Sequence, residues 1–182
     1  MSEKDKIIQK FIDDCKFKQS LVLAWKTWRW KTHIMTKLYS KLSTNEIMKT
    51  YYKYWIDDWQ VREYINAWIM NLKNNTKDNT NEYWAYPLEM CVRCKYLFFD
   101  DLGASENVSD PQKTKLKYIL DERHKRGLIN IFSTNCSPQH IEKLYGERIK
   151  SRIYDGTKNE VLIITVDGED RRKKQVTSIK LW

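Results

Sequence analysis

The chain has 182 residues, of which 41% are hydrophobic and 13% aromatic, a composition that is typical of a globular protein and excludes an intrinsically disordered one. The formal net charge of +9 indicates a polyanionic partner, with nucleic acid as the first candidate and a lysine-rich solvated surface as the alternative. No apolar run is long enough for a transmembrane helix, and the polar N-terminus does not resemble a signal peptide. We therefore expect a cytoplasmic protein.

The first half of the chain predicts two helices around a short strand, followed by a third helix. Apolar residues at helical spacing predict a helix over 6–19, and the apolar run 20–24 predicts a buried strand. A loop over 25–30 then leads into a helix whose N-terminus is expected near Lys31. A further helix is expected from about 57 to 72, and whether a strand precedes it is left open. The polar run 74–81 predicts an exposed loop.

The second half alternates strands and helices. Pro87 is expected to open a short helix that ends near 92, because proline suits the first helical turn. Cys91 and Cys94 lie in this segment as a lone CxxC pair, without the two further ligands that zinc needs. Strands are expected at 96–99, 128–135, 160–166 and 175–181, and helices at 110–126, 138–144 and 146–153. This alternation predicts an α/β fold with a mainly parallel sheet.

The stretch 25–33 has the spacing of a phosphate-binding P-loop. Four residues separate positions 25 and 30, and Lys31-Thr32 follows at the start of a predicted helix. A P-loop requires glycine at 25 and 30, but this chain has tryptophan at 25, 28 and 30. A glycine there permits positive φ and a close approach of the backbone to phosphate. Tryptophan prevents both, so we expect the printed chain to bind ATP poorly.

Polar side chains follow two of the predicted strands. Asp100 and Asp101 end one strand and Asn135 ends another, and the carboxyl ends of parallel strands meet at one edge of a sheet. Acids at such an edge can hold Mg²⁺ and activate a water, although aspartate also commonly ends strands for structural reasons alone. Arg148 and Arg152 share one face of a short helix and can reach an anion on a neighbouring subunit, or form a solvated basic face.

Taken together, these segments resemble the AAA+ ATPases of the DnaC/DnaI helicase-loader and IstB group, which are related to DnaA. Residues 31–33 resemble the end of their Walker A motif, 96–103 their Walker B motif, 133–138 sensor 1, and 146–153 the box VII segment with the arginine finger. The resemblance covers about 10–175 and is strong from 96 to 153. It implies one AAA+ domain over 1–182 with a three-layer P-loop NTPase core. The chain departs from the helicase loaders in one further respect, since we expect no separate N-terminal helicase-binding domain in it.

The resemblance also implies cofactors and residue roles. ATP and Mg²⁺ would be the cofactors. Asp101, Asn135, Arg152 and Arg148 would be catalytic, and Thr32 and Asp100 would hold the metal. The nucleotide-binding positions would be Trp25, Trp28, Arg29, Trp30, Lys31, Thr32 and His33.

Three explanations compete for the missing loop glycines: a decayed paralogue, a specialised pseudo-ATPase, and a decoding artefact in which UGA glycine codons are translated as tryptophan. Decay should not remove only the glycines while leaving the lysine, aspartates and asparagine of the motifs. The chain also has five glycines and eight tryptophans. Together these equal the number of about 13 glycines that is expected at the usual frequency of ~7%. The decoding explanation accounts for both observations, and we favour it.

The leading functional hypothesis is an ATP-binding AAA+ protein of DNA replication, a DnaC-like helicase loader that acts on single-stranded DNA. It implies a replicative helicase as partner, self-association for an arginine acting in trans, and ATPase activity if positions 25, 28 and 30 are glycine in the cell. One alternative is an IstB-like transposition ATPase with a transposase as partner. The other is a nucleotide-free pseudo-ATPase that serves as a binding module for nucleic acid.

Overall fold

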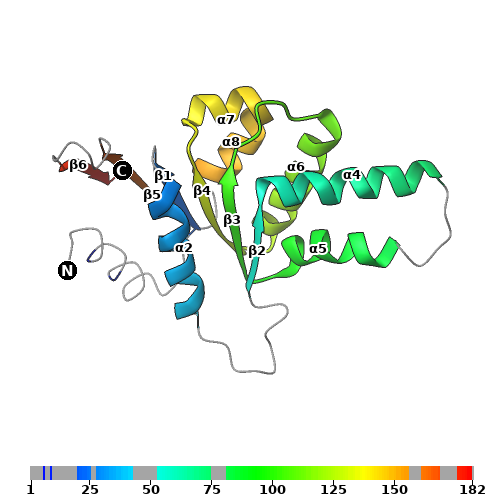
Figure 1. Cartoon of the computed structure of the whole chain (residues 1–182), viewed down its shortest axis with the longest axis horizontal. Coiled ribbons are helices and arrows are strands. Elements are labelled where there is room, and N and C mark those ends of the chain that lie inside the picture. The colour runs from blue at the N-terminus through cyan, green and yellow to red at the C-terminus, as the bar shows by residue number, and fades with distance from the viewer. Residues whose placement is uncertain are drawn as a thin grey trace.

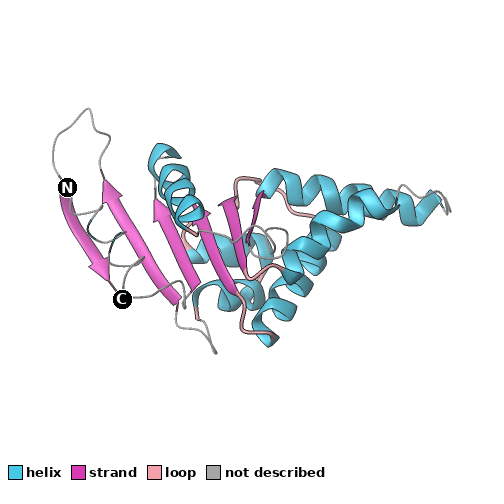
Figure 2. Ribbon diagram, turned by 90° about the horizontal axis from the view of Figure 1, so that it is seen from below, coloured by secondary structure: helices cyan, strands magenta, loops and turns pink. Residues whose placement is uncertain are grey.

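The computed structural model describes residues 6, 9, 20–25, 28–42, 53–74, 81–155, 161–168 and 176–181. Within these residues, a six-stranded sheet lies between helices on both of its faces (Figures 1 and 2). None of the described helices is long and apolar enough to cross a bilayer. The strands are β1 (Ser20–Trp25), β2 (Lys53–Asp57), β3 (Tyr96–Leu102), β4 (Ile129–Thr134), β5 (Val161–Gly168) and β6 (Val176–Leu181). The helices are α2 (Trp28–Lys41), α4 (Asp58–Asn74), α5 (Asn81–Arg93), α6 (Asp110–Lys125), α7 (Pro138–Tyr145) and α8 (Glu147–Tyr154).

The strand order is β2-β3-β4-β1-β5-β6. Strands β2, β3, β4, β1 and β5 are parallel, and β6 pairs antiparallel with β5. This confirms the predicted mainly parallel α/β sheet with helices as the outer layers. The order places β4 between β1 and β3, so the carboxyl ends of the three strands that carry the predicted motifs lie side by side.

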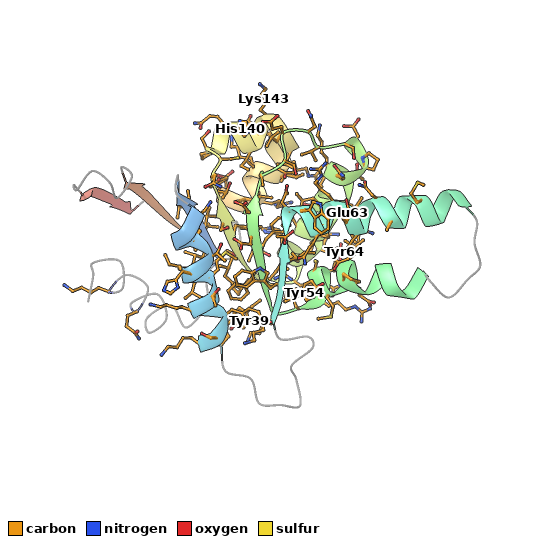
Figure 3. All side chains as sticks on the ribbon, in the orientation of Figure 1. Tyr39, Tyr54, Glu63, Tyr64, His140 and Lys143 are labelled. Carbon is orange, nitrogen blue, oxygen red and sulfur yellow. The ribbon has the colours of Figure 1, made fainter. Side chains whose placement is uncertain are left out.

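Helix α2 covers one face of the sheet. Its residue Met35 packs with Leu23, Phe98 and Ile131 in a buried apolar cluster. Tyr39 of α2 contacts the ring of Phe98 edge-on, with ring centroids 5.1 Å apart (Figure 3). These contacts fix the orientation of α2 on the sheet, and hence the position of its first turn at the carboxyl end of β1.

The other described helices cover the opposite face. Apolar residues of α4 to α8 pack there against β2, β3 and β4 around Phe99 and Phe132, whose ring centroids are 6.1 Å apart. Helices α4 and α5 run alongside each other and project beyond the edge strand β2 (Figure 1). His140 and Lys143 of α7 are exposed at the end of the molecule where β3 and β4 finish (Figure 3).

Two predicted helix boundaries were wrong. Helix α5 begins at Asn81 and has Pro87 in its interior, because its packing on α4 and α6 outweighs the backbone hydrogen bond that proline removes. Helix α2 begins at Trp28 rather than near Lys31, because tryptophan has no need of the positive φ that a glycine loop adopts. The strand left open before α4 is present as β2. Of the predicted loop at 74–81, Asn74 ends α4 and Asn81 begins α5, and residues 75–80 lie outside the described residues, as does most of the predicted helix at 6–19.

Arg123 joins three elements on the α5 side of the sheet. Its side chain is fully buried, and its Nε donates to Asn130 Oδ1 at 2.5 Å. One terminal nitrogen donates to the carbonyls of Cys91 and Cys94 at 2.8 Å each, and the other donates to the carbonyl of Ile129 at 2.6 Å. The guanidinium therefore pairs carbonyls at the C-terminus of α5, which the helix itself leaves without partners.

Arg123→Ala is expected to lower the free energy of unfolding by about 3–5 kcal/mol, because it leaves several buried acceptors unpaired. Chemical denaturation monitored by circular dichroism measures this change. Arg126→Ala is the matched control from the end of the same helix, where Arg126 is exposed and lies 3.7 Å from Glu122. We expect the control to change the unfolding free energy by less than about 1 kcal/mol. Equal effects of the two replacements would contradict this role for Arg123.

Candidate nucleotide-binding site

Lys31 lies in the first turn of α2, at the carboxyl end of β1. Its side chain is fully buried, which is unusual for lysine and requires partners for the ammonium group. Its Nζ donates to Asn135 Oδ1 at 2.5 Å and lies 3.7 Å from Asp101 Oδ1. The predicted P-loop lysine and the predicted sensor asparagine therefore meet directly, although 104 positions separate them in the sequence.

Burial and charge act in opposite directions on this lysine. Desolvation lowers the pKa of Lys31, and the negative charges of Asp101 and Asp100 oppose the decrease without cancelling it. An ammonium group in such a position gains from any additional anion placed beside it. A phosphate next to Lys31 would compensate for the solvation that burial removes.

The carboxylate of Asp100 faces the hydroxyl group of Thr32, the residue after Lys31. Thr32 Oγ1 donates to Asp100 Oδ2 at 3.2 Å, and Ser133 of β4 donates to Asp100 Oδ1. A carboxylate oxygen and a hydroxyl oxygen at this distance are the hard donors that Mg²⁺ prefers. The donor set therefore fits the predicted metal ligands, Thr32 and Asp100.

Asp101 completes the cluster. Its Oδ1 accepts a hydrogen bond from Asn135 Nδ2 at 3.1 Å, and its side chain is 31% exposed. Asp101 is the one non-glycine residue in the described part of the chain with positive φ, at 55°. The structure thus brings together five of the residues that the sequence singled out: Lys31, Thr32, Asp100, Asp101 and Asn135. We call these five residues the strand-end cluster.

Gly103 closes the turn that follows the cluster. Its φ is 83°, and an added Cβ would lie 2.9 Å from Cys136 Sγ and 3.0 Å from Ile141 Cδ1. A side chain at this position would therefore push apart the end of β3 and the start of α7. Gly103 therefore allows the chain after Asp101 to pack closely against the chain after Asn135.

The paired arginines lie away from the strand-end cluster. Arg152 donates from Nε to Asp121 Oδ1 at 2.8 Å, and Arg148 lies 3.9 Å from Asp121 Oδ2. Burial alone would raise the pKa of Asp121, but the hydrogen bond and charge of Arg152, with the charge of Arg148, lower it overall. Arg152 lines a small depression with Ser20 and Val161, the first residues of β1 and β5, so it lies near the amino ends of the strands.

The remaining predicted positions belong to α2 and the end of β1. His33 is exposed on α2. The backbone of Trp25 ends β1, and the backbones of Trp28, Arg29 and Trp30 form the start of α2. The side chains of these four residues lie outside the described residues.

Ser133 is the site residue that sequence reasoning missed. It is fully buried and contacts both aspartates, since Asp101 N donates to its Oγ at 2.8 Å and its own hydroxyl donates to Asp100. The sequence signal was its place near the end of a predicted strand, two residues before Asn135. A serine there has no distinctive pattern, because its role depends on the register between β3 and β4.

No protein-family model matches the chain, and no curated protein matches its sequence. Solved structures do match. The DnaC helicase loader is 22% identical with a TM-score of 0.59, over 87% of this chain and 86% of that chain. DnaI is 19% identical with a TM-score of 0.54, over 88% of this chain and 84% of that chain. The replication initiator DnaA bound to AMPPCP and single-stranded DNA is 13% identical with a TM-score of 0.59, over 89% of this chain but only 45% of that chain.

The chain has the fold of the DnaC, DnaI and DnaA structures. Its likeness to the DnaC and DnaI structures confirms the predicted fold resemblance to the helicase loaders and the three-layer α/β architecture. The DnaA likeness adds that a protein with this fold holds a nucleotide analogue. At these identities the comparisons establish the fold, and the roles of the individual residues remain predictions.

Proposed function

We propose that the protein is an ATP-binding AAA+ protein of DNA replication in the cytoplasm, a helicase loader of the DnaC kind that acts on single-stranded DNA. The observation that carries this proposal is the strand-end cluster, in which a buried lysine, a hydroxyl, two carboxylates and an amide from three neighbouring strand ends meet. The fold likeness to the DnaC helicase loader, over 87% of this chain and 86% of that chain, supports the proposal.

The chemistry of each side chain suggests its role. Lys31 would contact the terminal phosphates, and Thr32 with Asp100 would hold Mg²⁺, which neutralises phosphate charge when bound. Asp101 is partly exposed and would accept a proton from an attacking water, while the amide of Asn135 would orient that water. Arg152 lies too far from the cluster of its own chain for direct contact, so it would act on a second copy.

The surface of α6 supports contact with single-stranded DNA. Tyr118 is 50% exposed, and Lys115 Nζ lies 5.2 Å from the centroid of its ring. An exposed aromatic ring beside lysines can stack on a base while the cations contact the backbone. The net charge of +9 on the whole molecule also attracts a polyanion such as single-stranded DNA.

Tyr118→Ala is expected to weaken binding to a single-stranded oligonucleotide by about 5- to 100-fold, the usual effect of losing one stacked aromatic. Filter binding at low and moderate salt measures the affinity, which should fall as salt rises. Lys143→Ala is the control, because it removes an exposed charge from α7 and leaves α6 unchanged (Figure 3). Absence of any DNA binding at low salt would count heavily against the proposal.

A second candidate function is a nucleotide-free binding module for nucleic acid. The observation that favours it is that α2 begins at Trp28. Positions 28–30 of the P-loop-like stretch are therefore helical and do not form a phosphate-binding loop. ATP binding separates the two candidates when it is measured on the printed chain and on the variant Trp25→Gly, Trp28→Gly, Trp30→Gly, called the glycine form below. If the glycine form does not bind ATP, the binding module is the better description.

A further inference from the structure

Ser133 lies opposite an irregularity in the central sheet. Phe99 of β3 pairs with Phe132 of β4, and Leu102 pairs with Thr134, so three steps along β3 correspond to two steps along β4. This is the signature of a β-bulge, in which one strand has an extra residue without a ladder partner. The irregular stretch of β3 contains Asp100 and Asp101, and Ser133 is the residue that faces it.

The bulge changes the direction of the side chains. In a regular strand successive side chains point to opposite faces, so Asp100 and Asp101 would point away from each other. Phe98 packs on the α2 side of the sheet, whereas Phe99 and Leu102 both pack on the other side. The alternation is therefore broken between Phe99 and Leu102, which allows both carboxylates to join one cluster.

Ser133 supplies the contacts that the interrupted ladder lacks. Its Oγ accepts the backbone N–H of Asp101 at 2.8 Å, and its hydroxyl hydrogen goes to Asp100 Oδ1. One buried hydroxyl thus holds the backbone of one aspartate and the carboxylate of the other. It also offsets part of the strain at Asp101, whose φ of 55° is unfavourable for a residue with a Cβ.

We propose that Ser133 is a positioning residue that holds the bulge of β3 so that Asp100 faces Thr32 while Asp101 faces Lys31 and Asn135. The proposal rests on the proposed ATP- and Mg²⁺-binding function. With Ser133 in place, Asp100 keeps one oxygen on the serine and presents the other to the Thr32 hydroxyl at 3.2 Å. Without it, the Asp100 carboxylate is free to rotate and Asp101 loses its backbone support.

The test compares Ser133→Ala with its parent in the glycine form. Removal of a hydrogen-bond partner of a metal ligand typically weakens metal binding by about 10- to 100-fold. We expect the Mg²⁺ concentration at half-maximal ATP hydrolysis to rise by about 10-fold or more. Binding of a fluorescent ATP analogue in EDTA should change by less than about 2-fold, because the hydroxyl of Ser133 bonds to the two aspartates and the ammonium group of Lys31 bonds to Asn135.

Thr134→Val is the matched control. Thr134 is also fully buried in β4, but its hydroxyl donates to the carbonyl of Leu102 and accepts from the backbone of Cys136, so it does not contact either aspartate. We expect this variant to lose thermal stability and to keep its Mg²⁺ midpoint. A Ser133→Ala variant with an unchanged Mg²⁺ midpoint and normal ATP binding would overturn the proposal.

A double-mutant cycle on the printed chain tests the contact without nucleotide. Ser133→Ala and Asp100→Ala should lower the melting temperature by less together than the sum of their separate effects, since both remove the same hydrogen bond. Strictly additive effects would contradict the bridging role. A glycine form that binds no ATP would overturn the proposed function and the metal-related role of Ser133, and the cycle would still decide whether Ser133 holds the bulge.

Discussion

The glycine form is expected to bind ATP at least about 100-fold more tightly than the printed chain. Phosphate binding in a P-loop depends on several backbone N–H groups that point at the anion, and each charged hydrogen bond contributes about 1.5–3 kcal/mol. Two such bonds already correspond to this factor, because each 1.4 kcal/mol is about tenfold in affinity.

The backbone explains why the printed chain should lack these bonds. β1 ends at Trp25 and α2 begins at Trp28, so only two residues connect the strand to the helix. Glycine is less favourable in a helix than alanine by about 1 kcal/mol, and it alone adopts positive φ without strain. Glycine at 28 and 30 should therefore unwind the first turn of α2 into a loop that can surround a phosphate.

Isothermal titration calorimetry with ATP and Mg²⁺ measures the change. Trp59→Gly is the matched control, because it makes the same replacement at an exposed position in the first turn of a different helix, α4, and Trp59 is not part of the strand-end cluster. The control should leave ATP affinity as it is in the printed chain. Similar ATP affinities of the printed chain and the glycine form would contradict the prediction that glycine at these three positions is required for tight ATP binding.

The gene sequence tests the decoding explanation separately. UGA codons at positions 25, 28 and 30, in a lineage that translates UGA as glycine, would make the glycine form the protein that exists in the cell. UGG codons at these positions would refute recoding. The printed chain would then be the cellular one, and the nucleotide-free binding module would gain support.

Arg152→Ala in the glycine form is expected to lower the rate of ATP hydrolysis by about 10³-fold or more, the effect of losing an arginine that stabilises the transition state in trans. ATP affinity should change by only a few fold. The structure motivates this separation, because Arg152 lies by the amino ends of the strands and Lys31 lies at their carboxyl ends. Steady-state phosphate release and nucleotide titration measure the two quantities.

Mixing experiments distinguish an arginine acting in trans from a structural one. Lys31→Ala and Arg152→Ala proteins should each be inactive, and their mixture should recover part of the activity, because some interfaces then combine an intact Lys31 with an intact Arg152. Lys150→Ala, which removes a cation paired with Glu142 at 2.8 Å on the same helix pair, is the control and should retain hydrolysis. A mixture that stays inactive would argue that Arg152 serves only its ion pair with Asp121.

Local patterns in the sequence were sufficient for most of the described elements, β2 excepted, and for most of the cluster. Strand and helix periodicity are properties of neighbouring residues, so β3, β4 and α6 were placed to within a few residues. Lys31, Asp100, Asp101 and Asn135 could be chosen because each has a distinctive residue type at the end of a predicted element. The rule that parallel strands present their carboxyl ends at one edge then brought them together correctly.

The tertiary structure decided the features that depend on register and packing between distant segments. The role of Ser133 follows from a bulge between β3 and β4, which no periodicity within either strand reveals. The burial of Arg123 depends on carbonyls at the end of α5, and the start of α5 at Asn81 depends on packing that outweighs Pro87. The sequence by itself determined which chemical groups the site contains. Only the fold decided how they pair, because hydrogen bonds between groups 33 and 104 residues apart depend on three-dimensional alignment.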